Sequence, residues 1–262
     1  MRRINLSVSA GVIAVILLIL TAECAASGGS AGSAAAYESR SIVDMPTAGV
    51  VPKSSYAVEA TAFDGGGLAA GIFAAPFHNF NMGISFSGVN FIGAGDILWQ
   101  EIPGIHLRYR PFDETLYIPA FTIGVSTQGA GAYLRDADRF RVHSTGVYLA
   151  ASKNFRWAGG TVALHGGINY SFDPPSDSRS PNFYLGLEHS VGPAGALVVE
   201  YNANIDDGDT RLNSGKGLLS AALRWSVAPG LTLGLHVRDM LGRQKYSTGF
   251  TRFMTFEYIS PF

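Results

Sequence analysis

The sequence predicts an all-β protein, namely a closed antiparallel up-and-down transmembrane β-barrel of about twelve strands. Three observations favour this fold. Only 15% of the 262 residues are charged, while 47% are hydrophobic. Apolar and polar residues alternate with a period of two in one segment after another, as on strands with one oily face. Short connections alternate with longer ones, which is the asymmetry typical of outer-membrane barrels.

The first residues have the pattern of an export signal. Two arginines precede the apolar run GVIAVILLIL at 11–20, which is too short for a spanning helix. Small-residue cleavage sites follow at 24–26 and 34–36, and the choice between them stays open. A lipoprotein acylated at Cys24 is disfavoured because an acidic residue precedes the cysteine. We expect residues 1–36 to be a signal peptide and cleavage region, and the mature chain to reside in the bacterial outer membrane.

The stretch from 37 to 53 shows no hydrophobic period and is interrupted by Ser, Ala, Gly and Pro. We interpret it as a flexible periplasmic lead-in to the barrel, which then occupies residues 54–262. Composition leaves open whether this lead-in plugs the barrel.

The period-two segments give the predicted strands, whose even number returns both ends of the barrel to the periplasm. The predicted strands span 54–64, 67–76, 80–88, 104–112, 116–126, 144–155, 160–172, 181–191, 196–205, 216–228, 231–240 and 249–262.

One strand illustrates how the two faces divide. In FNMGISFSG, the residues Met82, Ile84 and Phe86 share one face, whereas Ser85 and Ser87 share the other. This follows because successive side chains of a strand point to opposite sides. The same division recurs along the chain, so we predict an apolar outer face in contact with outer-membrane lipid and a polar inner face.

The connections provide an independent argument for the barrel. If the first strand runs outward, the periplasmic connections are PFHN, PFDE, RWAGG, GPAG and APG, all of them short. The opposite connections are longer, polar or Gly-rich, and span 89–103, 127–143, 173–180, 206–215 and 241–248, except that the first outer turn, 64–66, is also short. A soluble β-sandwich, the alternative all-β fold, has no reason to produce this asymmetry.

The C-terminal strand carries an aromatic pattern. Met254, Phe256 and Tyr258 alternate toward the terminal Phe262. This resembles the aromatic-ended last strand that the barrel-assembly machinery reads, although Pro261 departs from the usual pattern. We therefore expect the barrel-assembly machinery to be a partner through this strand.

Ionisable residues at inward positions are the candidate lumen-lining residues. Two interpretations stay open for them. Opposite charges pair with one another and fill a narrow barrel, or they line a polar path or a sugar-binding surface. The candidates are Glu59, His106, Arg108, Arg110, His165, Glu188, Glu200, Arg224, His236, Arg238 and Glu257.

Catalytic and metal-binding patterns are weak. His143 and Ser144 lie in a predicted outer loop near Asp136 and Asp138, where a lipid-modifying enzyme would carry a Ser/His pair, but ordinary loop polarity explains them more simply. The acidic loop 204–213 lacks the spacing of a calcium loop and is interpreted as solvated. We expect no enzyme activity, no cofactor and no metal. The formal net charge of −1 gives no reason to expect a nucleic-acid partner.

Several short motifs resemble the YjbH-like outer-membrane proteins linked to exopolysaccharide production. They are DMPTAG at 44–49, FDGGG at 63–67, YRPFDE at 109–114, QGAGAY at 128–133, ASKNF at 151–155 and HGGINYSF at 165–172. The resemblance implies a noncatalytic barrel that assists export or assembly of a surface polysaccharide, with polysaccharide or other envelope proteins as partners. A small passive diffusion channel and an outer-membrane lipid-modifying enzyme are the alternative functions.

Overall fold

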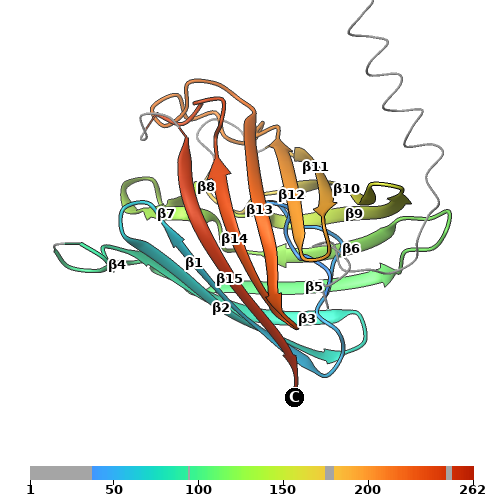
Figure 1. Ribbon diagram of the computed structural model, residues 1–262. Coiled ribbons are helices and arrows are strands. Elements are labelled where there is room, and N and C mark those ends of the chain that lie inside the picture. Colours follow the sequence, from blue (N-terminus) through green and yellow to red (C-terminus); the bar gives the residue numbers. More distant parts are fainter. Residues whose placement is uncertain (1–36, 94, 175–179, 246–249) are drawn as a thin grey trace, which may run out of the picture.

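The computed structural model describes residues 37–262 except 94, 175–179 and 246–249. The predicted signal peptide therefore lies outside the described residues. Twelve long strands form a closed antiparallel up-and-down barrel, which confirms the predicted fold class (Figure 1). Each strand pairs with its neighbours along the chain, and the last strand pairs with the first from Ser55↔Pro261 to Ala62↔Met254.

The strand bounds follow the predicted segments closely. The barrel strands are β1 (Ser55–Phe63), β2 (Gly67–Phe77), β3 (Phe80–Val89), β5 (Gly104–Phe112), β6 (Ala120–Ser126), β9 (Gly146–Trp157), β10 (Gly160–Tyr170), β11 (Asn182–Val191), β12 (Gly195–Asn202), β13 (Leu218–Ala228), β14 (Leu231–Arg238) and β15 (Thr251–Pro261). Three short strands lie in the loops, namely β4 (Leu98–Trp99), β7 (Ala130–Leu134) and β8 (Arg139–Val142).

The outer face of the barrel is apolar and exposed. On β3, Ile84 is 58% exposed, whereas the neighbouring inward residues Asn81 and Ser87 are buried. β11 repeats the pattern, since Leu185 is exposed and Glu188 is buried. Exposed aliphatic and aromatic side chains on strand after strand form a far larger apolar surface than a soluble monomer carries. This surface belongs to a membrane-embedded barrel. Among the described residues, no helix is long and apolar enough to cross a membrane.

Charge on the outer face is expected to oppose assembly. Ile84→Arg places a cation toward the hydrocarbon and should destabilise the barrel by roughly 2–4 kcal/mol if the site lies near the bilayer midplane. Ser85→Arg on the inner face should cost less. Folding titrations into lipid vesicles measure both variants, and equal tolerance would contradict the assigned faces.

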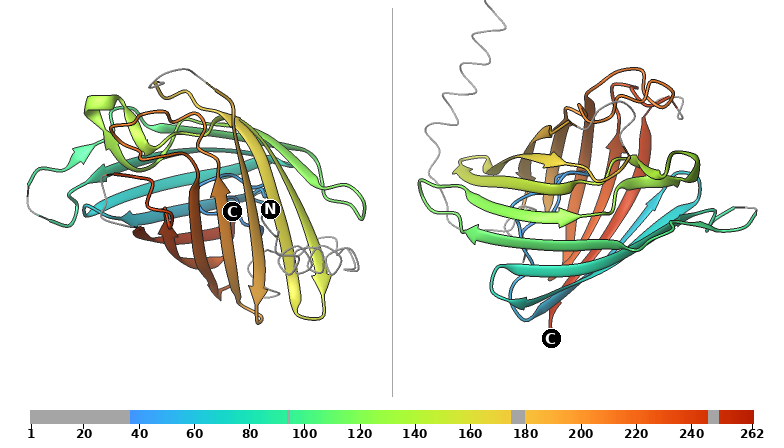
Figure 2. Two further views of the ribbon diagram at one scale, coloured as in Figure 1. Left: turned by 90° about the horizontal axis from the view of Figure 1, so that it is seen from above. Right: turned by 180° about the vertical axis from the view of Figure 1, so that it is seen from behind.

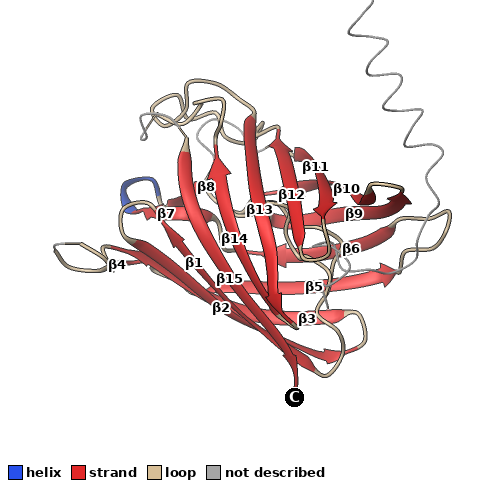
Figure 3. Cartoon of the chain, in the orientation of Figure 1, coloured by secondary structure: helices blue, strands red, loops and turns tan. Residues whose placement is uncertain are grey.

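The two ends of the barrel differ. The end at which β2–β3, β5–β6, β9–β10, β11–β12 and β13–β14 are joined is called the short-turn end, and the other the long-loop end. β6 begins at Ala120 rather than at the predicted 116, because Lys153 and Glu114 hold residues 113–119 as a loop beside β9. At the long-loop end, the predicted loop 127–143 contains the β7–β8 hairpin and one short helical turn (Figure 3).

Candidate functional site

The segment before β1 runs inside the ring of strands (Figures 1 and 2). Residues 38–51, called the plug from here on, fold into a hairpin. The amide of Thr47 donates to the carbonyl of Arg40 at 3.1 Å, and that of Ile42 donates to Met45 at 2.7 Å. Gly49 permits the close approach of the two arms, since a Cβ there would lie 2.2 Å from the carbonyl oxygen of Ser39. The sequence suggests a flexible lead-in, whereas the structure shows a packed insert.

Apolar side chains seat the plug against the wall. Ile42 is fully buried in a cluster with Tyr184 and Val198, and it lies against Gly186 of β11. A Cβ at position 186 would lie 2.6 Å from Cγ2 of Ile42, so glycine leaves room for the Ile42 side chain. The other arm buries Val51 in a second cluster with Ala57, Phe73 and Ala75.

Wall side chains hold the backbone of the plug tip. Oε2 of Glu200 accepts the consecutive amides of Val43, Asp44 and Met45 at 2.8, 2.9 and 2.9 Å. Nη2 of Arg224 donates to the carbonyl of Ser41 at 2.7 Å and also to that of Ile42. The wall thus provides an acceptor for amides of this turn and a donor for its carbonyls, as buried backbone groups require.

Further wall residues hold the two arms. Arg108 donates from Nη1 to the carbonyls of Arg40 and Gly49 at 3.0 and 2.6 Å. Ser152 accepts the amide of Ala48 at 2.9 Å, and Thr122 donates to the carbonyl of the same residue at 2.8 Å. Asn81 accepts from and donates to Val51, at 2.8 and 3.0 Å respectively.

Ion pairs join the plug to three parts of the wall. Arg40 pairs with Glu257 at 2.9 Å and also with Glu59. These two carboxylates face each other across the β1–β15 seam in register. Asp44 forms a two-bond pair with Arg238, at 2.6 Å for each bond. Glu38 pairs with Arg110 near the short-turn end.

All of the predicted lumen-lining residues lie on the inner side of the barrel. Among the described residues, Glu188 and Arg224 form the one ion pair between two members of that set, with 3.3 Å between Oε2 and Nη1. The three histidines instead contact hydroxyl groups: His106 lies 2.8 Å from Ser85, His165 lies 2.8 Å from Ser152, and His236 lies 2.8 Å from Thr255. Of the two interpretations left open, mutual pairing therefore holds for Glu188 and Arg224, whereas most of the other charged wall residues pair with the plug.

The lumen is mostly filled. A cavity of about 250 Å³ remains beside the plug. This volume lies just below the range of small-molecule pockets, which measure about 300–1,000 Å³. Its lining includes Arg40, Arg108, His106, Gln128, Phe73 and Phe253.

The plug contributes the functional residues that the sequence analysis missed. The segment that contains Arg40, Ile42 and Asp44 has no hydrophobic period. The neighbouring sequence therefore does not indicate that their partners lie in distant strands. The DMPTAG motif was the one signal in this region, and it carries no information on contacts.

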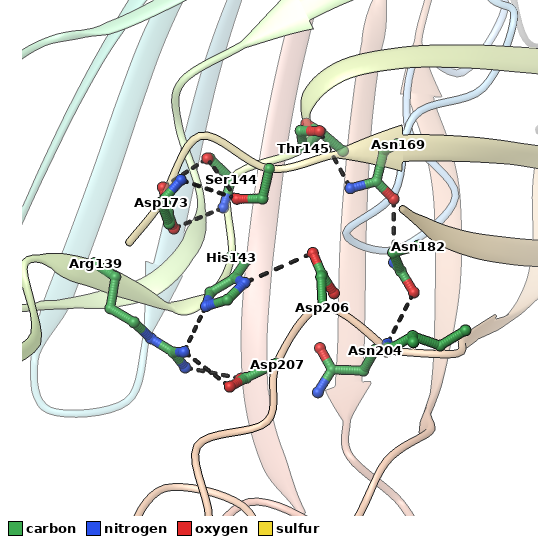
Figure 4. Close-up of polar contacts among 12 residues, drawn as sticks. Arg139, His143, Ser144, Thr145, Asn169, Asp173, Asn182, Asn204, Asp206 and Asp207 are labelled. Carbon is green, nitrogen blue, oxygen red and sulfur yellow. Dashed lines mark hydrogen bonds and ion pairs between the residues drawn. The ribbon is translucent and has the colours of Figure 1, made fainter. Parts of the chain in front are cut away.

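Loops at the long-loop end form a separate buried polar cluster (Figure 4). Arg139 makes a two-bond pair with Asp207, at 2.8 Å for each bond, and the side chain of Asp207 is 2% exposed. Nδ1 of His143 lies 3.6 Å from Asp206. The interpretation of this acidic loop as solvated is therefore wrong. Arg139 of the β8 strand neutralises the charge of Asp207. This pairing could not be predicted from local sequence, because the two residues are 68 positions apart.

The Ser/His candidate does not form a catalytic pair. Ser144 donates to Asp173 at 2.6 Å, while the adjacent His143 points to Asp206 and Arg139. Asp138 contacts Tyr133 instead. Within the described parts of the chain, no group of His, Cys, Asp and Glu is arranged to hold a metal ion.

Acidification is expected to loosen this cluster. Burial raises the pKa of Asp207, but the hydrogen bonds and the charge of Arg139 outweigh it and hold the pKa below the ordinary 3.8. The pair therefore stabilises the loop at pH above 3.8, and this contribution is lost as the pH falls through the lower folded-state pKa. Asp207→Asn should remove about 3–5 kcal/mol of local stability at neutral pH. Limited proteolysis of intact protein checks this, and unchanged cleavage near 203–217 would contradict it.

No protein-family model and no curated protein matches the chain. Among solved structures, the NanC porin is similar to it, with a TM-score of 0.41 and 10% sequence identity. The match covers 79% of this chain and 99% of that porin chain.

Proposed function

We propose that this protein is a noncatalytic barrel of the bacterial outer membrane that assists export or assembly of a surface polysaccharide, and that its own plug closes the lumen at rest. The buried, hydrogen-bonded plug is the observation that carries the proposal. The wall side chains of Glu200, Arg224 and Arg108 form hydrogen bonds with the plug backbone, so closure of the lumen depends on these residues.

Several observations support the location and the polysaccharide role. The apolar outer face, the predicted signal peptide and the aromatic C-terminal strand are typical of outer-membrane barrels. The polysaccharide role rests on the resemblance to YjbH-like proteins. Ser144 bonded to Asp173 rather than to a histidine favours a noncatalytic role over a lipid enzyme. The filled lumen favours a gated conduit or scaffold over a permanently open channel.

A disulfide lock tests whether plug release is required. Because a Cβ at 186 would lie 2.6 Å from Cγ2 of Ile42, the Cβ atoms of residues 42 and 186 lie within about 4 Å, which suits a disulfide. The locked variant is Ile42→Cys with Gly186→Cys, made in a Cys24→Ser background. The single Ile42→Cys variant is its matched control.

Surface polysaccharide is measured in cells lacking the gene and complemented with each variant. We expect loss without the protein, recovery with wild type, and recovery with the locked variant only after a thiol reductant is added. Unchanged surface polysaccharide in the deletion strain would overturn the polysaccharide role. Equal recovery with and without reductant would overturn the need for plug release.

A further inference from the structure

Many of the hydrogen bonds between wall and plug go to backbone groups, which every polypeptide shares. Glu200 accepts three backbone amides, and Arg224 and Arg108 each donate to two backbone carbonyls. Asn81, Thr122 and Ser152 likewise contact backbone atoms. A run of polar donors and acceptors on the wall therefore recognises the plug backbone, beside the ion pairs made by Glu38, Arg40 and Asp44.

These six wall groups lie on six different strands and follow the plug from its tip to its base. Glu200 and Arg224 hold the tip, Arg108, Thr122 and Ser152 hold the middle, and Asn81 holds Val51 near the base. Aromatic surfaces alternate with them, including buried Tyr184 beside the tip and Phe73 beside the base. The result is a polar track with apolar patches that follows the plug along the lumen.

Withdrawal of the plug would remove the hydrogen bonds that these wall groups make with its backbone. Buried donors and acceptors that lose their hydrogen bonds are costly, so a ligand that restores them gains affinity. Hydroxyl groups both donate and accept, which matches a wall that offers guanidinium, carboxylate, amide and hydroxyl groups together. The C–H faces of sugar rings complement the aromatic patches.

We propose that the plug occupies the binding track of an extended polyhydroxylated chain, and that Arg108, Arg224 and Glu200 are the principal recognition groups of this track. The inference rests on the proposed function and names the site at which the polysaccharide is bound. In this account the plug is a resident mimic of the ligand, and the ligand and plug compete for the same wall groups.

The test uses a full-length variant whose plug is weakened without altering the three recognition residues. Arg40→Glu, called the released variant, adds a third carboxylate to Glu59 and Glu257 and so repels the plug from the seam. The probes are a neutral hexasaccharide of glucose, a hexasaccharide of uronic acids, and a synthetic peptide covering 38–51. Binding to detergent-solubilised, heat-modifiable and therefore folded protein is measured by calorimetry.

We expect the released variant to bind at least one hexasaccharide, and the oxidised locked variant to bind neither. Adding Arg108→Gln or Glu200→Gln to the released variant should weaken binding about tenfold, as for one charge-assisted hydrogen bond. Arg141→Gln, which removes a cation paired with Asp64 at the rim, is the matched control and should leave affinity unchanged.

Three results would overturn the inference. They are a folded released variant that binds no saccharide, saccharide binding that is insensitive to both wall substitutions, and binding of the peptide alone. Each is distinguishable from failure of the proposed function, because the cellular polysaccharide assay does not depend on affinity for these probes.

Discussion

Arg40→Glu is expected to turn a closed barrel into a conducting one. Arg40 neutralises Glu59 and Glu257, which face each other across the seam between the first and last strands. Removing one partner of a buried ion pair costs about 3–5 kcal/mol, and the cost here is smaller because the Glu59 side chain is 38% exposed. The reversed charge adds repulsion, so the plug should leave the seam. Single-channel recording in planar bilayers measures the conductance.

Reversing both charges provides the control for this variant. Arg40→Glu combined with Glu257→Arg restores an opposite-charge pair at the same site, and we expect it to restore closure. Conductance that persists in the double variant would show that the opening came from damage to the seam rather than from lost attraction. Wild-type conductance in Arg40→Glu would contradict the role assigned to Arg40.

Glu200→Ala is expected to release the tip of the plug. The substitution leaves the amides of Val43, Asp44 and Met45 without the acceptor they share. Each buried amide that loses its partner costs about 1–3 kcal/mol, so the tip should no longer be stable in the lumen. Hydrogen exchange of the amides of residues 42–45 should accelerate, and open events should become more frequent.

Two further variants refine this prediction. Glu200→Gln keeps one acceptor oxygen and should show intermediate exchange and conductance. Adding Arg224→Ala to Glu200→Ala also removes the donor to Ser41 and Ile42, and should give steady conductance. Slow exchange of the tip in Glu200→Ala would contradict the account, because the amides would then have other partners.

The barrel could be predicted because its pattern is local. A strand residue faces lipid or lumen according to its parity, so Ile84 and Ser85 are distinguishable from sequence alone. Closure followed from the even number of strands and the alternating lengths of their connections. The inward position of Glu200 and Arg224 came from the same parity argument.

The plug could not be predicted because its interactions are long-range. Val43 and Glu200 are separated by 157 residues, and Arg40 and Glu257 by 217. A segment that makes no regular structure shows no period, and its packing depends on a cavity that exists only after the barrel closes. The same reason applies to Asp207, whose partner Arg139 lies on another loop.

The most direct test of plug gating is single-channel conductance of Arg40→Glu carrying the Ile42→Cys and Gly186→Cys lock. The account predicts a silent barrel when the disulfide is formed and steady conductance after reduction, with wild type remaining closed under both conditions. Conductance that is the same before and after reduction, in protein shown to be folded and crosslinked, would contradict the claim that the plug closes the lumen.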